Sequence, residues 1–94
     1  MEGKIIFLRK KQFYGFLIPI NIYLDGKEVG SVNNGEKIEV KTEIGKHRIA
    51  FDLWSGNGQY DIEVTEEHPN IQVEFKIGMG LVTSKPKIVK ISNI

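Results

Sequence analysis

The sequence predicts an all-β protein, a single domain over residues 1–94 that forms a two-layer antiparallel β-sandwich of seven to eight short strands. Two observations lead to this prediction. Apolar and polar residues alternate along several runs, and a period of two places successive side chains on opposite faces of a sheet. Glycine-rich turns separate these runs at intervals of about 8 to 12 residues, with no helical period between them. A small barrel is the alternative that these observations leave open.

The strongest local signal is a hairpin in the first third of the chain. Residues 20–24 alternate between apolar and polar side chains and lead into Asp25-Gly26. This dipeptide is typical of a type I′ turn, which needs positive φ at both central residues. We therefore expect residues 27–32 to form the second strand of a hairpin.

The other strands follow from the same alternation. The first run is continuously apolar, which indicates a strand covered on both faces. The last run is interrupted by Pro86, which suits an edge strand or a bulge because proline cannot donate to the ladder. The remaining predicted strands are residues 5–8, 38–42, 49–54, 60–65, 71–77 and 81–92.

One segment departs from the strand pattern. Gly15 and Pro19 disfavour a central strand in this part of the chain, although it is rich in large apolar residues. It is either a loop folded over an open end of the sandwich or an exposed contact surface. The residues concerned are Phe13, Tyr14, Phe16, Leu17 and Ile18.

Charge is distributed unevenly along the chain although the net charge is only +1. Residues 1–27 carry +3, residues 28–75 carry −6 and residues 76–94 carry +4. If the terminal strands pair, their cations could form one positive surface that attracts phosphates or acidic partners. Solvated lysines that protect strand edges are the simpler interpretation. The cations in question are Lys4, Arg9, Lys10, Lys11, Lys85, Lys87 and Lys90.

No catalytic, cofactor-binding or metal-binding residue is assigned. The chain has no cysteine, and His47 and His68 lack the spacing of a zinc site. His47 stands where a strand begins. Three carboxylates, Asp52, Asp61 and Glu63, could face one another across a hairpin, but alternation places them on the solvent face.

Trp54 and Tyr60 flank the turn at residues 55–58. In a simple hairpin about that turn the two rings would lie nearly opposite each other and pack as a cross-strand pair. Aromatic rings beside a glycine-rich loop could instead stack on a sugar or a base.

The order from Tyr23 to Phe51, in which an alternating strand leads into a DG turn and then a G-x-H hairpin entry, resembles the PEGA-type group of small β-sandwich domains. The matching positions are Asp25, Gly26, Gly30, Gly45 and His47. Ser31 and Val32 stand where that group usually has Thr-Pro. The resemblance implies an immunoglobulin-like or prealbumin-like fold and a non-enzymatic accessory or interaction module, and it brings no catalytic residue. It also implies that His47 packs or hydrogen-bonds near the turn; a proton-switching role is the alternative.

We therefore expect a non-catalytic module that binds another protein or has a structural role. The alternative is weak binding of anions, nucleic acid or carbohydrate, although nucleic acid is not favoured. Self-association through an edge strand is a further possibility, and no run is long enough to cross a membrane. A full-length chain would be cytoplasmic, and a fragment could come from a surface or envelope protein. The surface residues expected to take part are Phe13, Tyr14, Phe16, Leu17, Trp54, Tyr60, Lys10, Lys11, Lys87 and Lys90.

Overall fold

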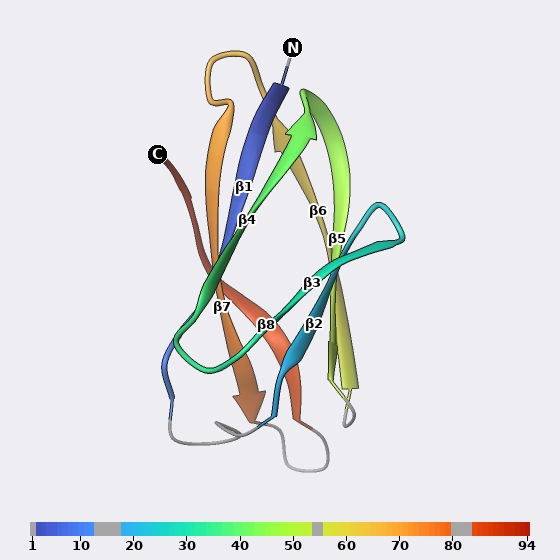
Figure 1. Ribbon diagram of the computed structural model, residues 1–94, viewed down its shortest axis with the longest axis vertical. Coiled ribbons are helices and arrows are strands. Elements are labelled where there is room, and N and C mark those ends of the chain that lie inside the picture. The colour runs from blue at the N-terminus through green and yellow to red at the C-terminus, as the bar shows by residue number, and fades with distance from the viewer. Residues whose placement is uncertain (1, 13–17, 54–55, 80–83) are drawn as a thin grey trace.

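The structure is a computed structural model, and it describes residues 2–12, 18–53, 56–79 and 84–94. Within these residues the chain forms eight strands and no helix. The strands make two four-stranded sheets that pack face to face (Figure 1). The predicted β-sandwich is confirmed, and the structure selects it over the barrel. The strands are β1 (Glu2–Arg9), β2 (Ile20–Leu24), β3 (Lys27–Val32), β4 (Lys37–Glu43), β5 (Gly45–Leu53), β6 (Gly56–Val64), β7 (Asn70–Met79) and β8 (Ser84–Asn93).

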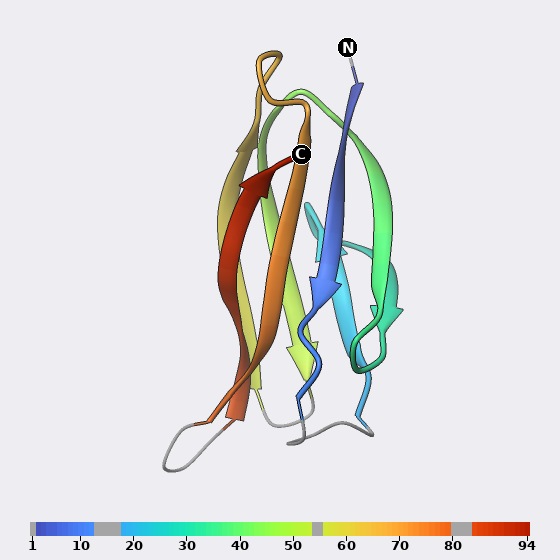
Figure 2. The same ribbon diagram turned by 90° about the vertical axis from the view of Figure 1, so that its left-hand side faces the viewer.

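Sheet A has the strand order β4-β1-β7-β8, and sheet B has the order β3-β2-β5-β6. Neighbouring described strands are antiparallel, as expected, apart from β1 and β7, which run parallel. Figure 2 shows sheet A facing the viewer, with β8 and β4 at its two margins. The first and last described strands therefore lie in one sheet, on either side of β7.

The β2–β3 hairpin forms as the Asp25-Gly26 signal predicts. Asp25 has a φ of 51° and Gly26 a φ of 85°, so both central residues lie in the left-handed region. Asp and Gly are among the residues that accept this conformation most readily. The register of the hairpin shifts between Ile22 and Tyr23, which marks an irregularity in the β2–β3 pair.

The core lies between the two sheets, and its buried side chains come from β1, β2, β3, β5, β6 and β7; β4 and β8 supply partly buried side chains that pack against it. Phe51 of β5 is at its centre: its ring stacks on Phe75 at 4.3 Å between centroids and meets Phe7 edge-on at 6.1 Å. All three rings are fully buried. The other core side chains are Ile5, Ile20, Ile22, Leu24, Val32, Ile49, Leu53, Ile62, Val64, Ile71, Val73 and Ile77.

The final strand is an edge strand, as Pro86 suggests. β8 borders sheet A and pairs with β7 alone among the described strands. The β7–β8 register shifts between Glu74 and Phe75 of β7, which lie opposite Lys90 and Ile88, whereas Pro86 pairs in regular register with Ile77. The contact surface expected at Phe13, Tyr14, Phe16 and Leu17 lies outside the described residues, as does Trp54.

Candidate interaction surfaces

His47 and Asp25 form the most closely hydrogen-bonded polar group on the surface of sheet B. The pairing of β2 with β5 brings the β2–β3 turn beside His47, although the two residues are 22 positions apart. His47 Nδ1 lies 2.6 Å from Asp25 Oδ2, and His47 Nε2 lies 2.7 Å from the Glu43 carbonyl oxygen. The Arg48 amide donates to the other Asp25 oxygen at 2.8 Å. His47 therefore ties a turn of sheet B to the end of β4, in agreement with its interpretation as a turn-associated residue.

The protonation state of His47 follows from the carboxylate and the carbonyl that lie closest to its two ring nitrogens; the Thr42 hydroxyl lies farther from Nε2, at 3.3 Å. A carboxylate and a carbonyl are acceptors only, so both ring nitrogens are satisfied when the ring is a doubly protonated imidazolium. Burial lowers the pKa of His47, but the hydrogen bonds to Asp25 and Glu43 and the nearby negative charge outweigh it, so the pKa is raised above its ordinary value of 6.5. The same bond to His47, with the Arg48 amide, lowers the pKa of Asp25 below 3.8.

These shifts predict a pH window for the pair's contribution to stability. The raised pKa of His47 stabilises the fold below pH 6.5, and this contribution is lost as pH rises through the folded pKa. The lowered pKa of Asp25 stabilises the fold above pH 3.8, and this contribution is lost as pH falls through the folded pKa. We expect Asp25→Asn to reduce the free energy of unfolding most between these two values, by about 1 kcal/mol, and less above neutral pH. Urea titrations of the native protein and the variant across this pH range measure the difference.

Asp25→Ala is the companion variant. This substitution also removes the carboxylate oxygen that accepts the hydrogen bond from the Arg48 amide. It places alanine, whose side chain cannot hydrogen-bond to the nearby backbone, at a φ of 51°. The loss expected is about 2 kcal/mol, larger than for asparagine, which tolerates this conformation. A difference between native protein and Asp25→Asn that does not change with pH would show that the His47 pair is not ionised in the folded protein.

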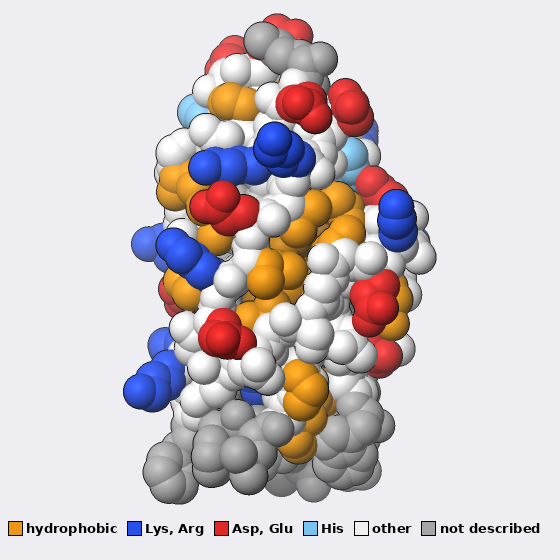
Figure 3. Space-filling view, in the orientation of Figure 1, with side chains coloured by type: hydrophobic (Ala, Val, Ile, Leu, Met, Phe, Trp, Pro, Cys, Tyr) orange, Lys and Arg blue, Asp and Glu red, His pale blue; other side chains and the backbone are white. Residues whose placement is uncertain are grey.

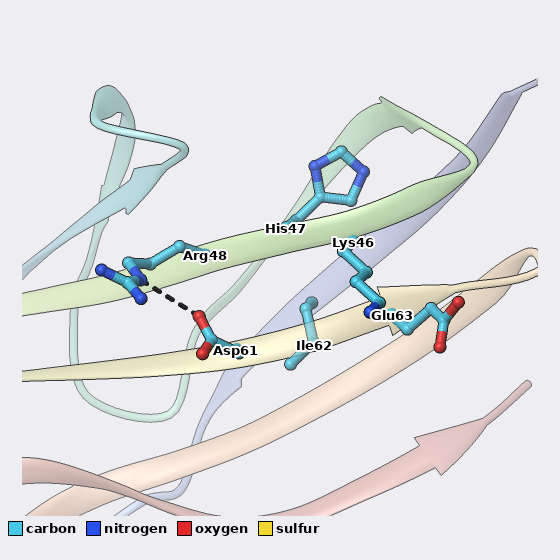
Figure 4. A pocket seen from close by; sticks show the side chains of 6 residues that line it. All are labelled: Lys46, His47, Arg48, Asp61, Ile62 and Glu63. Carbon is cyan, nitrogen blue, oxygen red and sulfur yellow. Dashed lines mark hydrogen bonds and ion pairs between the residues drawn. The ribbon is translucent and has the colours of Figure 1, made fainter.

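A depression lies along β5 and β6 of sheet B. This open depression of about 600 Å³ is lined by Lys46, His47, Arg48, Asp61, Ile62 and Glu63. Figure 4 shows Lys46 extending toward β6 while the His47 ring points away from it, and the dashed line joins Arg48 to Asp61. That ion pair measures 3.0 Å and is more than half exposed on both sides. Exposed pairs of this kind contribute roughly 0 to 1 kcal/mol, so the pair defines the surface chemistry more than the stability.

The three carboxylates considered across the hairpin do not face one another. In the β5–β6 register Asp61 lies opposite Arg48, Glu63 opposite Lys46 and Asp52 opposite Asn57. Each acidic residue thus meets a cationic or amide side chain. Within the described residues, no group of three or more His, Asp or Glu side chains is arranged to hold a metal ion.

Tyr60 is partly buried and packs against the core. Its ring meets Phe51 at 6.1 Å between centroids, and its hydroxyl donates to the Pro86 carbonyl at 3.3 Å. Tyr60 lies opposite Ile49 in the β5–β6 register. Its expected pairing with Trp54 concerns a residue outside the described ranges.

Lysines gather at the end of sheet A where β7 meets β8. Lys76 lies directly opposite Lys87 across the two strands, and Lys90 lies opposite Glu74. Lys10 follows β1 and donates its amide to the Phe75 carbonyl at 2.8 Å, which places it beside Lys76. Figure 3 shows Lys and Arg side chains along the margin formed by sheet A. We call this group, formed by Lys10, Lys76, Lys85, Lys87 and Lys90, the lysine patch.

The lysine patch differs in two ways from the positive surface expected from the terminal segments. Lys76 belongs to it, which only the β7–β8 pairing reveals. Arg9 does not, because its side chain is fully buried. Lys11 is exposed but lies beside the turn at Gly35. Its Cβ is 3.6 Å from the point that a Cβ would occupy if residue 35 had a side chain.

Exposed apolar residues adjoin the lysine patch along β8. Among the described residues the large apolar side chains with the greatest exposure are Val89, Ile91 and Ile94, at 41%, 48% and 55%. All three lie on β8 or immediately after it. This border of sheet A therefore combines positive charge with apolar area, a composition suited to contact with another protein.

Comparisons with protein-family models, with curated proteins and with solved structures found no match. The resemblance to PEGA-type domains stays a prediction. No helix in the described ranges is long and apolar enough to cross a membrane.

Proposed function

We propose that the protein is a non-catalytic interaction module that binds an acidic surface of a partner protein through the lysine patch. The observation that carries this proposal is the direct cross-strand pairing of Lys76 with Lys87. Like charges placed opposite each other on a sheet destabilise it. Lys85 and Lys90 add positive charge on the same strand, and Glu74 is the acidic residue facing this group. A bound acidic partner would relieve this repulsion.

The composition of the patch favours a protein partner over nucleic acid. Its cations are all lysines, whereas planar bidentate recognition of phosphate is the property of arginine. Among its described residues there is no aromatic ring on which a base could stack. The adjoining Val89 and Ile91 are half exposed and offer apolar contact area instead. These features support an acidic protein surface with an apolar component.

The test measures the binding of a glutamate-rich peptide that contains valine at alternate positions. Changes in the backbone NMR chemical shifts of the protein report the binding. We expect the largest shifts at Lys76, Lys87 and Val89, with affinity falling as salt is raised. Lys87→Glu should weaken binding about tenfold or more. It should also raise the free energy of unfolding by roughly 0.2 to 1 kcal/mol, because Lys76 then faces an opposite charge.

Lys27→Glu is the matched control, since Lys27 is an exposed lysine at the start of β3 in sheet B. It makes the same change in net charge away from the patch, and we expect little effect on binding. Equal losses in the two variants would mean that only net charge matters and would contradict the proposal. Tighter retention on single-stranded DNA than on the acidic peptide would assign the patch to nucleic acid instead.

A further inference from the structure

β4 is an edge strand whose free backbone groups can be identified from its pairing with β1. The Arg9 amide donates to the Glu36 carbonyl at 2.9 Å, and Arg9 and Glu36 continue the register of the β1–β4 pair by one step. Hydrogen-bonded pairs alternate in an antiparallel ladder, so Ile38, Val40 and Thr42 direct their backbone groups toward β1. The backbone groups that point away from sheet A belong to Lys37, Glu39, Lys41 and Glu43.

The same four residues alternate in charge along the strand. They read Lys, Glu, Lys, Glu, and their side chains are exposed on the outer face of sheet A. In Figure 3 positive and negative side chains alternate over β4, and apolar side chains lie between this strand and the β2–β3 hairpin. Ile38 and Val40 pack against the core and are only partly buried.

We propose that the protein forms a twofold-symmetric dimer in which β4 pairs antiparallel with β4 of a second copy, centred on Val40. In this register Glu39 of one copy lies opposite Lys41 of the other, and Lys37 lies opposite Glu43. Every outward pair then joins opposite charges, which stabilises a cross-strand pair. The residues of these pairs also direct their backbone groups away from β1, so the ladder between copies forms without disturbing β1. The Glu43 carbonyl, which accepts a hydrogen bond from His47 Nε2 within its own chain, has a second lone pair for the Lys37 amide of the other copy.

Neighbouring registers lack this complementarity. Centring the pair on Glu39 or on Lys41 aligns the free backbone groups equally well, but it places Glu opposite Glu and Lys opposite Lys. In a register shifted by a single residue, the free backbone groups of one strand lie opposite residues of the other strand whose backbone groups are already bonded to β1. Among the longer overlaps, the register centred on Val40 is therefore the one that satisfies both hydrogen bonding and charge.

The other described edge strands are less suited to self-pairing. β8 contains Pro86 and an irregular register, and β3 pairs irregularly with β2, features that protect edges from addition of another strand. β6 carries Asp61 and Glu63, whose charges have the same sign. Figure 2 shows β4 at the free margin of sheet A, opposite β8. The dimer would form one continuous sheet and leave both lysine patches on the same outer face.

The first test is a charge exchange followed by light scattering during size-exclusion chromatography over a range of concentrations. The native protein should be a dimer. Glu39→Lys and Lys41→Glu should each raise the dissociation constant at least about tenfold, because each creates two like-charge contacts across the twofold axis. The double variant E39K/K41E should restore the dimer. A monomeric native protein, or a double variant that stays as dissociated as the single ones, would overturn the proposal.

The second test fixes the register. The chain has no cysteine, so an introduced one reports on a single position. Val40→Cys should form a disulfide-linked dimer on mild oxidation. The two copies of residue 40 form a non-hydrogen-bonded pair, in which their Cβ atoms lie about 4.5 to 5.5 Å apart. In Lys37→Cys the two copies would lie roughly 20 Å apart along the strands and should not cross-link. Equal cross-linking at both positions would contradict the register.

This inference does not depend on the proposed function. Lys87→Glu should leave the dimer intact, and Lys41→Glu should leave acidic-peptide binding at the lysine patch intact except for a loss of avidity. A negative result for the dimer therefore does not bear on peptide binding at the lysine patch, and a negative result for peptide binding does not bear on the dimer.

Discussion

Replacement of Phe51 by alanine is expected to destabilise the protein by about 3 to 5 kcal/mol. The Phe51 ring is fully buried and touches aromatic rings from three strands: Phe7 on β1, Tyr60 on β6 and Phe75 on β7. Two of these strands belong to sheet A and one to sheet B. The substitution therefore opens a cavity where the sheets meet and removes three ring contacts at once. A domain of 94 residues has a total stability of roughly 5 to 14 kcal/mol.

Urea unfolding followed by circular dichroism measures this loss, with two variants as controls. Phe51→Leu retains much of the volume and should cost less than half as much as alanine. Ile91→Ala removes an apolar side chain that is 48% exposed, and its effect should stay within about 0.5 kcal/mol. Similar losses for Phe51→Ala and Ile91→Ala would show that Phe51 does not hold the two sheets together.

The strands could be predicted from the sequence because their signals are local. Asp25 and Gly26 specify the hairpin turn through their own conformational preferences, and the alternation around Ile22 fixes which side chains face inward. The parallel pairing of β1 with β7 has no such signal. It joins Ile5 to Ile71, and it depends on which sheet each strand enters. That choice is made by tertiary packing and not by any short stretch of sequence.

The candidate surfaces show the same division. Lys10, Lys87 and Lys90 are suggested by the concentration of charge near the chain ends, and the sheet brings them together. Lys76 joins them only through the β7–β8 register. The partner of His47 was likewise not predictable, because Asp25 reaches it across the β2–β5 pairing. An Asp at a tight turn and a His at the start of a strand suggest hydrogen bonding in general, but not with each other.

Arg9 is the clearest departure from sequence expectation, since a cation next to Lys10 and Lys11 reads as part of a solvated segment. The alternation of β1 explains its burial: Ile5, Phe7 and Arg9 are two apart and all face inward. Its Nη1 donates to the Ile18 carbonyl at 2.6 Å and to the Val32 carbonyl at 2.9 Å. Arg9 thus connects sheet A to the backbone on both sides of the β2–β3 hairpin. Burial lowers the pKa of its guanidinium.

Replacement of Arg9 by methionine is expected to destabilise the protein by about 2 to 4 kcal/mol. Two effects oppose each other. Methionine has a similar length and removes the cost of burying a charge. It also leaves the Ile18 and Val32 carbonyls without the Arg9 donor, at about 1 to 3 kcal/mol for each buried group that stays unsatisfied. The second effect should prevail, because both carbonyls lie at the end of the sandwich where Arg9 joins the sheets.

Arg9→Lys separates the two effects. Lysine retains the charge, but its single ammonium group lacks the planar fork with which arginine directs several donors in fixed geometry. We therefore expect Arg9→Lys to lower the free energy of unfolding, measured in urea, but by less than Arg9→Met lowers it. Hydrogen exchange supplies the second readout, since loss of the connection should speed exchange at Val32 and its β2 partner Ile20 before the rest of sheet B. A methionine variant as stable as the native protein would show that charge burial, and not the bridge between the sheets, decides the energetics at this position.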